Sequence, residues 1–237
     1  MNFANPAVVP DVNKRDETGA WMRLLSPAPR VCLTGPLDSG RQQVEGYIAR
    51  RYLGAFGAQV DSFMPWLLTL ECLDTLTGVA GMQVADANPL FLEQYLEEPV
   101  EQLMSRVLDN QITRSSVVEI GNLVAAKRGA SHLLFLLFTS VLHAAGYEHI
   151  VFTATRALRN NLEKVGFTLV ELQKVDVSKL DPGTIAQWGN YYRTEPVVVT
   201  GSLATANAII QSRPLLRRVL RLYRSQIETL ATQLHRG

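Results

Sequence analysis

The sequence predicts an α/β protein of the α+β type, in which a mixed sheet is covered by helices on both faces. Two short apolar runs, 67–72 and 78–85, are joined by turn residues in the first half of the chain. Strand and helix patterns then alternate from 116 to 172. Hairpins make antiparallel neighbours and crossover helices make parallel ones, so both kinds of pairing are expected in one sheet.

The elements of the first half follow from apolar spacing and turn residues. Residues 1–30 contain four prolines and mixed polar residues, which indicates a loose N-terminal arm. A short strand is expected at 31–37. Apolar residues three and four positions apart predict a helix over 41–56. The segment DTLTG, residues 74–78, has the turn chemistry of a hairpin between two strands.

The second half alternates strands with helices. Residues 90–108 are expected to be helical, with Pro99 either breaking that helix or opening a new first turn. Ser131 is the expected N-cap of a helix over 131–146. The remaining predicted elements are strands at 116–125, 149–155, 168–172 and 197–201, and a helix at 157–167.

A domain over 31–203 is therefore expected, followed by a separate basic amphipathic helix over 204–237. Apolar residues recur at three- and four-residue steps through that helix. From Arg213 onward, six arginines stand against one acid, Glu228. Such a helix can pack on its own protein or on a second subunit, which is the favoured interpretation. It can also lie on an anionic membrane surface or dock an acidic carrier protein.

Composition restricts the class of protein. With 47% hydrophobic and 19% charged residues, the 237-residue chain is typical of a soluble globular protein. A net charge of +1 argues against a dedicated nucleic-acid binder. The two cysteines form no CxxC pair, so neither a disulfide framework nor a metal site is expected. No secretion signal or spanning segment is recognised, and a cytoplasmic protein is expected.

Glu119 is the first candidate for chemistry, because it interrupts an apolar strand. Side chains alternate along a strand, so Val117, Glu119, Gly121 and Leu123 share one face. Gly121 indicates a bulge or a close approach to the backbone. A buried carboxylate there would have a raised pKa and could act as a general base. The alternative is an ion-paired structural residue.

The segment KRGAS, residues 127–131, is the second candidate. It opens a predicted helix, whose first turn has free N–H groups and a positive dipole end. Lys127 and Arg128 would strengthen an anion site for the phosphates of a thioester donor. Most glycine-containing turns of this kind bind nothing, so this hypothesis needs further support.

Residues 115–170 resemble the core of the GCN5-related N-acetyltransferase (GNAT) fold. They give a strand, a phosphate-binding turn, a helix, a strand and a helix that ends in Gly166-Phe167. This resemblance implies a mostly antiparallel sheet and a thioester donor. The turn departs from the family's pattern, since only Gly129 fits fully, with Ala126 and Ser131 at the neighbouring motif places. Leu162 stands where the family often has a tyrosine acid, so another group must protonate the leaving thiolate.

A narrower resemblance extends over about 40–203. The segments LFLEQYLEEPVE, EIGNL, VFTATRALRN, WGNYY and PVVVTG resemble the thermostable hemolysin family. Its members look like distant relatives of N-acyl amino acid and acyl-homoserine lactone synthases. The resemblance therefore implies an acyl-CoA or phosphopantetheine-linked acyl carrier protein as donor, an amine acceptor, and no metal.

The resemblance also implies roles for particular residues. Glu119 would be the general base, and Tyr191 or Tyr192 either the missing acid or part of the acceptor pocket. The alternative for these tyrosines is an aromatic corner that packs the last strand. The acidic segment EQYLEEPVE either selects a cationic acceptor or is a solvated helix face. Expected donor-binding residues are Gly121, Asn122, Leu123, Lys127, Arg128, Gly129, Ala130 and Ser131, and expected substrate-binding residues are Thr155, Arg156 and Trp188.

The sequence thus predicts an N-acyltransferase that moves an acyl group, in this hypothesis a long one, from a carrier-protein or CoA thioester to an amine by direct attack. Two alternatives stay open. One is a membrane-active, hemolytic protein that acts through the basic C-terminal helix. The other is a non-catalytic module that binds an acyl carrier protein.

Overall fold

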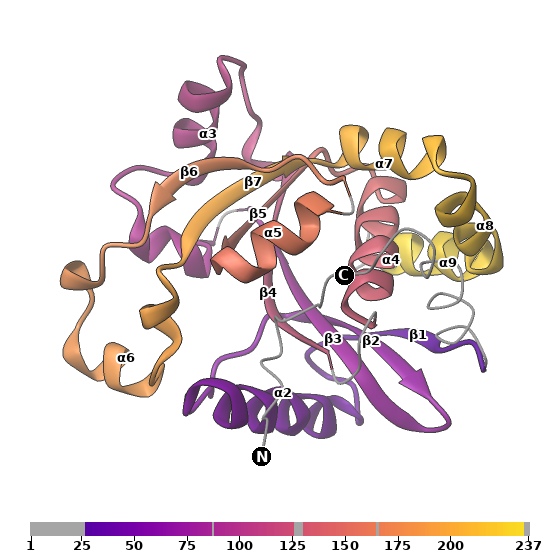
Figure 1. Ribbon diagram of the computed structural model, residues 1–237, viewed down its shortest axis with the longest axis horizontal. Coiled ribbons are helices and arrows are strands. Elements are labelled where there is room, and N and C mark those ends of the chain that lie inside the picture. The colour runs from indigo at the N-terminus through magenta and orange to yellow at the C-terminus, as the bar shows by residue number, and fades with distance from the viewer. Residues whose placement is uncertain (1–26, 87, 126–129, 165, 235–237) are drawn as a thin grey trace.

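A computed structural model describes residues 27–86, 88–125, 130–164 and 166–234. They form one seven-stranded sheet with the order β1-β2-β3-β4-β5-β7-β6 (Figure 1). The strands are β1 (Arg30–Thr34), β2 (Trp66–Cys72), β3 (Thr75–Val84), β4 (Val117–Ala125), β5 (His149–Ala154), β6 (Val170–Lys174) and β7 (Val197–Ser202).

In the described part of the chain, five of the six strand pairings are antiparallel, and only β4 and β5 run parallel. The mixed, mostly antiparallel sheet that the sequence predicts is therefore confirmed. The parallel pairing is short: it begins with Val117 opposite His149 and ends with Glu119 opposite Val151. Beyond Glu119 the two strands diverge, and the site described below lies at this point.

Helices cover both faces of the sheet (Figure 1). Alternation along β4 divides the core, because Val118 and Ile120 join one hydrophobic cluster whereas Val117 joins another. The first cluster contains residues of α4 (Ala130–Ala144), α5 (Arg156–Lys164), α7 (Leu203–Ser212), α8 (Pro214–Leu222) and α9 (Arg224–Leu234). The second contains residues of α2 (Arg41–Phe56), the 3-10 helices η1 (Phe91–Tyr95) and η4 (Tyr191–Thr194), and α3 (Val100–Leu108).

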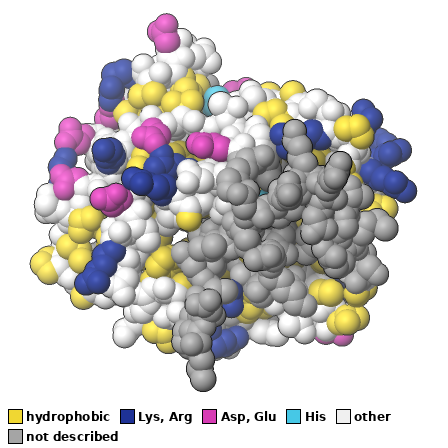
Figure 2. Space-filling view, in the orientation of Figure 1, with side chains coloured by type: hydrophobic (Ala, Val, Ile, Leu, Met, Phe, Trp, Pro, Cys, Tyr) yellow, Lys and Arg dark blue, Asp and Glu magenta, His cyan; other side chains and the backbone are white. Residues whose placement is uncertain are grey.

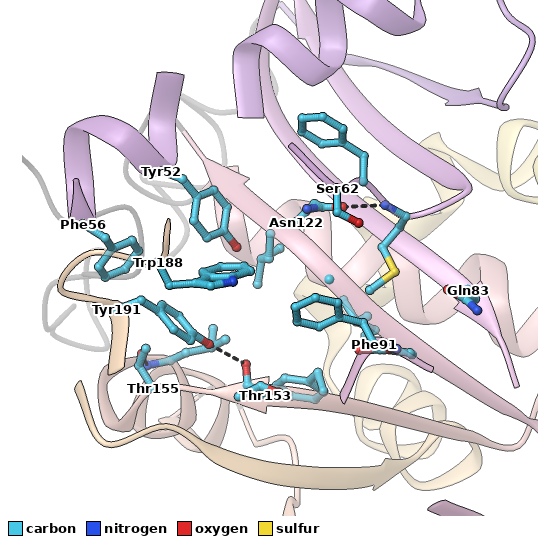
Figure 3. Close-up of a pocket in the computed structure, with 18 of the residues that line it drawn as sticks. Tyr52, Phe56, Ser62, Gln83, Phe91, Asn122, Thr153, Thr155, Trp188 and Tyr191 are labelled. Carbon is cyan, nitrogen blue, oxygen red and sulfur yellow. Dashed lines mark hydrogen bonds between the residues drawn. The ribbon is translucent and has the colours of Figure 1, made fainter. Parts of the chain in front are cut away.

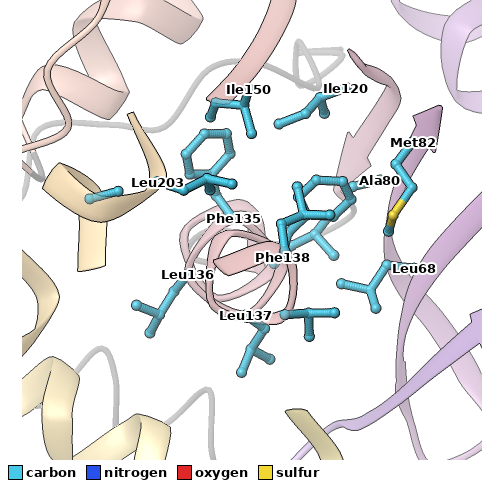
Figure 4. Close-up of a cluster of buried hydrophobic side chains, with 14 of the residues drawn as sticks. Leu68, Ala80, Met82, Ile120, Phe135, Leu136, Leu137, Phe138, Ile150 and Leu203 are labelled. Carbon is cyan, nitrogen blue, oxygen red and sulfur yellow. The ribbon is translucent and has the colours of Figure 1, made fainter. Parts of the chain in front are cut away.

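Helix α4 is apolar because it is buried on nearly every side. Phe135 and Phe138 point toward the sheet residues Ile150 and Ile120 (Figure 4). The other sides of the helix meet α7 and α9. The near-continuous run of leucine and phenylalanine is therefore core.

The C-terminal segment packs on the body of the protein, which is one of the two arrangements that the favoured interpretation of the sequence included. It forms α7, α8 and α9 in place of one long helix, and Tyr223 separates α8 from α9 with a non-helical backbone conformation. Its apolar positions, among them Val219, Tyr223 and Leu230, join the cluster around α4. No helix in the described part of the chain is long and apolar enough to cross a membrane.

Two further regions refine the sequence-based expectations. The predicted helix over 90–108 is divided into η1 and α3, and α3 begins directly after Pro99. Between β6 and β7 the chain forms η3 (Val177–Lys179), α6 (Pro182–Gln187) and η4, which the apolar pattern did not predict. The start of α6 has a local cause: the Asp181 side chain accepts hydrogen bonds from the N–H groups of Gly183 and Thr184.

Candidate active site

A cavity of about 150 Å³ opens where β4 and β5 diverge. Three segments far apart in the sequence supply most of its aromatic walls (Figure 3). Tyr52 and Phe56 come from the end of α2, Phe91 and Tyr95 from η1, Trp188 from the turn after α6, and Tyr191 from the start of η4. The cavity is also lined by residues 119–123 and Ala125 of β4, and by Phe152, Thr153 and Thr155 at the end of β5.

Glu119 lies at this cavity and is 2% exposed. Its two carboxylate oxygens accept hydrogen bonds from the backbone N–H groups of Phe91, at 2.7 Å, and Leu92, at 3.0 Å. No described cation forms an ion pair with it, so the ion-pair alternative does not hold for the described residues. Burial raises the pKa of Glu119 to about 8, although the two backbone hydrogen bonds act in the opposite direction.

The expected bulge is present in β4. Gly81 of β3 lies opposite Gly121, but Val79 lies opposite Val124. Two residues of β4 therefore lie opposite the single β3 residue Ala80. One of the two is Asn122, whose φ of 49° is in the left-handed region. Its side-chain oxygen accepts a hydrogen bond from the N–H of Met64 at 2.7 Å.

Met64 explains why Gly121 has no side chain. A Cβ at Gly121 would lie 2.4 Å from the Met64 Cε, and one at Gly81 would lie 2.7 Å from the Met64 Cβ. The close approach that this glycine indicated is therefore made by a side chain of the protein itself. The Met64 side chain forms part of the cavity wall next to the bulge.

Of the WGNYY residues, Trp188 and Tyr191 line the cavity and Tyr192 lies behind them. The ring of Trp188 is 5.2 Å from that of Tyr191, 5.8 Å from that of Phe91 and 5.9 Å from that of Tyr52, centroid to centroid. The Tyr192 hydroxyl lies 3.0 Å from the Tyr95 hydroxyl. Burial raises the pKa of both Tyr191 and Tyr192, so each phenol stays neutral and is a weak proton donor to a thiolate.

An ion-pair network holds η1 in place. The Arg114 guanidinium donates to Glu93 at 2.7 Å and to Glu101 at 2.7 Å. Burial by itself would raise the pKa of Glu93, but Arg114 and the N–H groups of Val100 and Leu90 lower it to about 2. The other acids of EQYLEEPVE also form ion pairs: Glu97 with Lys179, and Glu98 with Arg106. None of these acids lines the cavity.

The expected donor-binding residues divide into three groups. Gly121, Asn122, Leu123 and Ser131 line the cavity. Ala130 is buried as the first residue of α4, so Ser131 lies inside the first turn and is not the N-cap. Lys127, Arg128 and Gly129 lie outside the described residues, as does Ala126.

The two expected substrate-binding residues at the end of β5 have different positions. Thr155 lines the cavity, and its hydroxyl accepts a hydrogen bond from the N–H of Leu158 at the start of α5. The Arg156 side chain is 76% exposed, lies 3.9 Å from Glu195, and does not line the cavity. Of these two residues, the structure therefore places Arg156 away from the cavity.

Several cavity residues were not predicted from the sequence. They include Tyr52, Phe56, Ser62, Met64, Gln83, Phe91 and Tyr95. Gln83 could have been predicted, because the β3 residue that pairs with Glu119 has its side chain on the same face of the sheet. The described residues contain no group of three or more His, Cys, Asp or Glu that could hold a metal ion.

Solved structures share this fold at low sequence identity. TofI in its apo form has a TM-score of 0.55 at 12% identity, over 79% of this chain and 99% of that chain. The CoA-dependent acyl-homoserine lactone synthase BjaI, with SAM and isopentyl-CoA, has 0.53 at 10% identity, over 78% and 89%. FeeM, an N-acyl amino acid synthase from uncultured soil microbes, has 0.53 at 12% identity, over 77% and 95%.

At these identities the likeness establishes the fold, and the GNAT-like expectation is confirmed. No curated protein matches the sequence. The family described as thermostable hemolysin matches residues 34–207, which is most of the chain. The protein therefore belongs to the thermostable hemolysin family.

Proposed function

We propose that the protein is an N-acyltransferase, which moves an acyl group from a thioester donor to an amine acceptor. The observation that carries this proposal is the position of Glu119: a buried carboxyl with a pKa near 8, at a cavity where β4 and β5 diverge. A base with a pKa near the working pH suits proton transfer. The likeness to BjaI and FeeM, which are synthases that form acyl products, supports the same reaction class.

The donor occupies the gap between β4 and β5 in this proposal. Past Glu119 and Val151, the facing edges of the two strands no longer pair with each other. An extended chain that carries amides, such as a phosphopantetheine arm, can form hydrogen bonds with such an edge. Its phosphates would then approach the N-terminus of α4, where helix N–H groups favour anions. Acyl-CoA and acyl carrier protein share this arm, and either fits as donor.

The chemistry follows from one carboxyl group. The amine nitrogen attacks the thioester carbonyl carbon, and the Glu119 carboxylate takes the proton that the nitrogen loses. A backbone N–H near the bulge at Gly121 stabilises the oxygen of the tetrahedral intermediate. The C–S bond then breaks, and the thiolate takes the proton from Glu119. A thiol pKa of roughly 8.5 is close to that of Glu119, so this return needs no second acid.

The test is acceptor-dependent release of free thiol from acyl-CoA and acyl carrier protein thioesters of several chain lengths. Glu119→Gln should lower kcat by about 100-fold or more, because general-base catalysis contributes roughly 10²–10⁴-fold. The matched control is Glu148→Gln, which alters an exposed acid. Near-UV circular dichroism must show that Glu119→Gln keeps its fold, because glutamine places an NH₂ group against one of the two backbone donors.

Three outcomes separate the parts of this proposal. Loss of release in Glu119→Gln alone supports a transferase with Glu119 as its base. Release that the substitution leaves unchanged keeps the transferase and removes Glu119 from the base role. Absence of release from every donor and amine combination contradicts the proposed activity.

A second candidate function, peripheral binding to an anionic surface, is favoured by the outer face of α8. Arg217, Arg218 and Arg221 are exposed there, beside Leu222, which is 63% exposed. Figure 2 shows basic side chains gathered at the right-hand edge of the molecule, where Figure 1 places α8. Sedimentation with phosphatidylserine vesicles tests it: wild type should bind, and a triple Arg→Gln variant should not. Equal binding by both would contradict it.

A further inference from the structure

The described residues that line the cavity at Glu119 carry fixed charge of one sign. Among the described residues that line it, Glu119 is the only acid, and none is Lys, Arg or His. The polar groups that remain are hydroxyls and side-chain amides, such as those of Ser62, Gln83 and Thr153. The cavity thus offers a partner for a positive group, and its described wall offers none for a carboxylate.

The described arginines near the cavity are directed elsewhere. Arg114 binds Glu93 and Glu101, and Arg159 pairs with Glu171. Arg51 donates to the carbonyl of Ala125 at 2.9 Å, at the end of β4 that leads to α4. A positive group therefore lies at the end of β4 where the donor's phosphates would approach in the proposed function.

The aromatic walls favour a cation over an anion. The rings of Trp188, Tyr52, Phe91 and Tyr191 lie around one space (Figure 3), and Glu119 lines the same cavity. The face of an aromatic ring is negative, so it attracts an ammonium group and repels a carboxylate. A carboxylate buried here would also face the Glu119 carboxylate without a counter-charge from the described lining residues, which is unfavourable for two like charges removed from water.

We propose that the acceptor is an amine without a carboxylate group, an aromatic or short alkyl amine that enters as its ammonium ion and lies against the aromatic walls. This inference rests on the proposed function and narrows it, because it excludes free amino acids as preferred acceptors. The ammonium ion pairs with the Glu119 carboxylate on entry and gives it one proton, which Glu119 releases to water before the attack, so that the carboxylate is free to take the second proton that the nitrogen loses. The neutral amine that results is the nucleophile.

The experiment compares amines with the amino acids that differ from them only by the carboxylate. The pairs are tyramine with tyrosine, tryptamine with tryptophan, and isopentylamine with leucine, each with the same acyl-CoA donor. The carboxylate-free member should have a kcat/KM at least tenfold higher in at least one pair. Its binding to the free protein, measured by calorimetry, should also be at least tenfold tighter.

A charge added at the rim tests the cause. Ser62 is exposed and lines the cavity, so an arginine there can be accommodated without repacking the core. Ser62→Arg should reduce the preference for the carboxylate-free member at least tenfold, and Ser62→Met, which adds bulk without charge, should not. An unchanged preference in Ser62→Arg would contradict the electrostatic cause on which the inference rests.

The outcomes distinguish this inference from the proposed function. If the amino acids are transferred as well as the amines, or better, the inference is overturned and the N-acyltransferase stands. If no compound supports thiol release and no member of any pair binds, both are overturned. If the amines bind more tightly than the amino acids but are not acylated, the preference of the cavity is supported and the proposed reaction is not.

Discussion

A single carboxyl makes the stability of this protein depend on pH. The pKa of Glu119 is raised by burial to about 8, from the ordinary value of 4.5 that applies in the unfolded chain. The folded protein therefore holds the proton more tightly than the unfolded one. The stabilisation is complete below about pH 4.5 and is lost as the pH rises through 8, with a slope of at most ~1.4 kcal/mol per pH unit.

Urea unfolding between pH 5 and 9 checks this expectation. The free energy of unfolding of wild type should decline with pH relative to that of Glu119→Gln, which has no proton to lose. The difference between the two proteins removes the contributions of His132 and His149, whose pKa values burial lowers. Parallel curves would show that the carboxyl keeps an ordinary pKa.

In wild type, kcat/KM should rise over the same pH range, because the carboxylate is the base.

The two glycines opposite each other on β3 and β4 should respond differently to alanine. At Gly81 the new Cβ would meet the Cβ and Cγ of Met64, which are fixed close to the backbone, at 2.7 and 2.8 Å. At Gly121 it would meet first the terminal Met64 Cε, which can rotate away. Gly81→Ala should therefore lower the free energy of unfolding by about 1–3 kcal/mol, the usual range for overpacking, and Gly121→Ala by less.

Chemical denaturation of both variants, alone and combined with Met64→Ala, provides the check. Truncating Met64 should remove most of the cost at Gly81, and this coupling identifies the contact. Equal costs at the two glycines, or no rescue by Met64→Ala, would contradict the argument.

At the scale of elements, the short helix η1 connects the ion-pair network to the site. Its backbone N–H groups bind Glu119, its Glu93 binds Arg114, and its Phe91 and Tyr95 form part of the cavity wall. Arg114→Met leaves Glu93 and Glu101 half-buried without their cation. Removing the cation leaves two partly buried carboxylates without a partner. We therefore expect a loss of about 2 kcal/mol in the free energy of unfolding and a higher KM for the acceptor.

Arg106→Met is the matched control for this prediction. Arg106 pairs with Glu98, but its side chain is 65% exposed, and exposed pairs contribute roughly 0–1 kcal/mol. Thermal melts and acceptor titrations of the two variants should therefore differ. If Arg114→Met changes stability but leaves the acceptor KM unaffected, η1 does not position the site.

The elements that could be predicted are those with a local cause. The helix Arg41–Phe56 follows from apolar spacing alone, and both of its ends agree with the prediction. Strand β4 and the bulge near Gly121 also follow from local pattern. The aromatic walls could not be predicted in this way, because Tyr52, Phe91 and Trp188 meet only through the tertiary fold. The partner of Glu119 could not be predicted either, since it is the backbone of η1 and leaves no side-chain signature.

For the whole molecule, the C-terminal helices matter first for folding. Deleting 204–237 would remove α8, α9 and most of α7, and with them Ile210, Val219 and Tyr223 from the cluster that covers α4. The exposed face of α4 would be rich in leucine and phenylalanine, which favours aggregation. We expect the truncated chain to be insoluble, or to elute in the void volume on size exclusion and to lack a cooperative melt.

The control for the truncation is a variant in which the exposed arginines Arg217, Arg218 and Arg221 are replaced by glutamine. These side chains project from the outer face of α8, so the variant should melt within about 1 °C of wild type, because surface substitutions rarely change stability by more than ~0.5 kcal/mol. A truncated chain that stays monomeric and folded would show that α7–α9 are an appendage. If the truncated chain unfolds as expected, its loss of function reports only unfolding. Any role of the basic face in binding membranes or a carrier protein must therefore be measured in the charge variant.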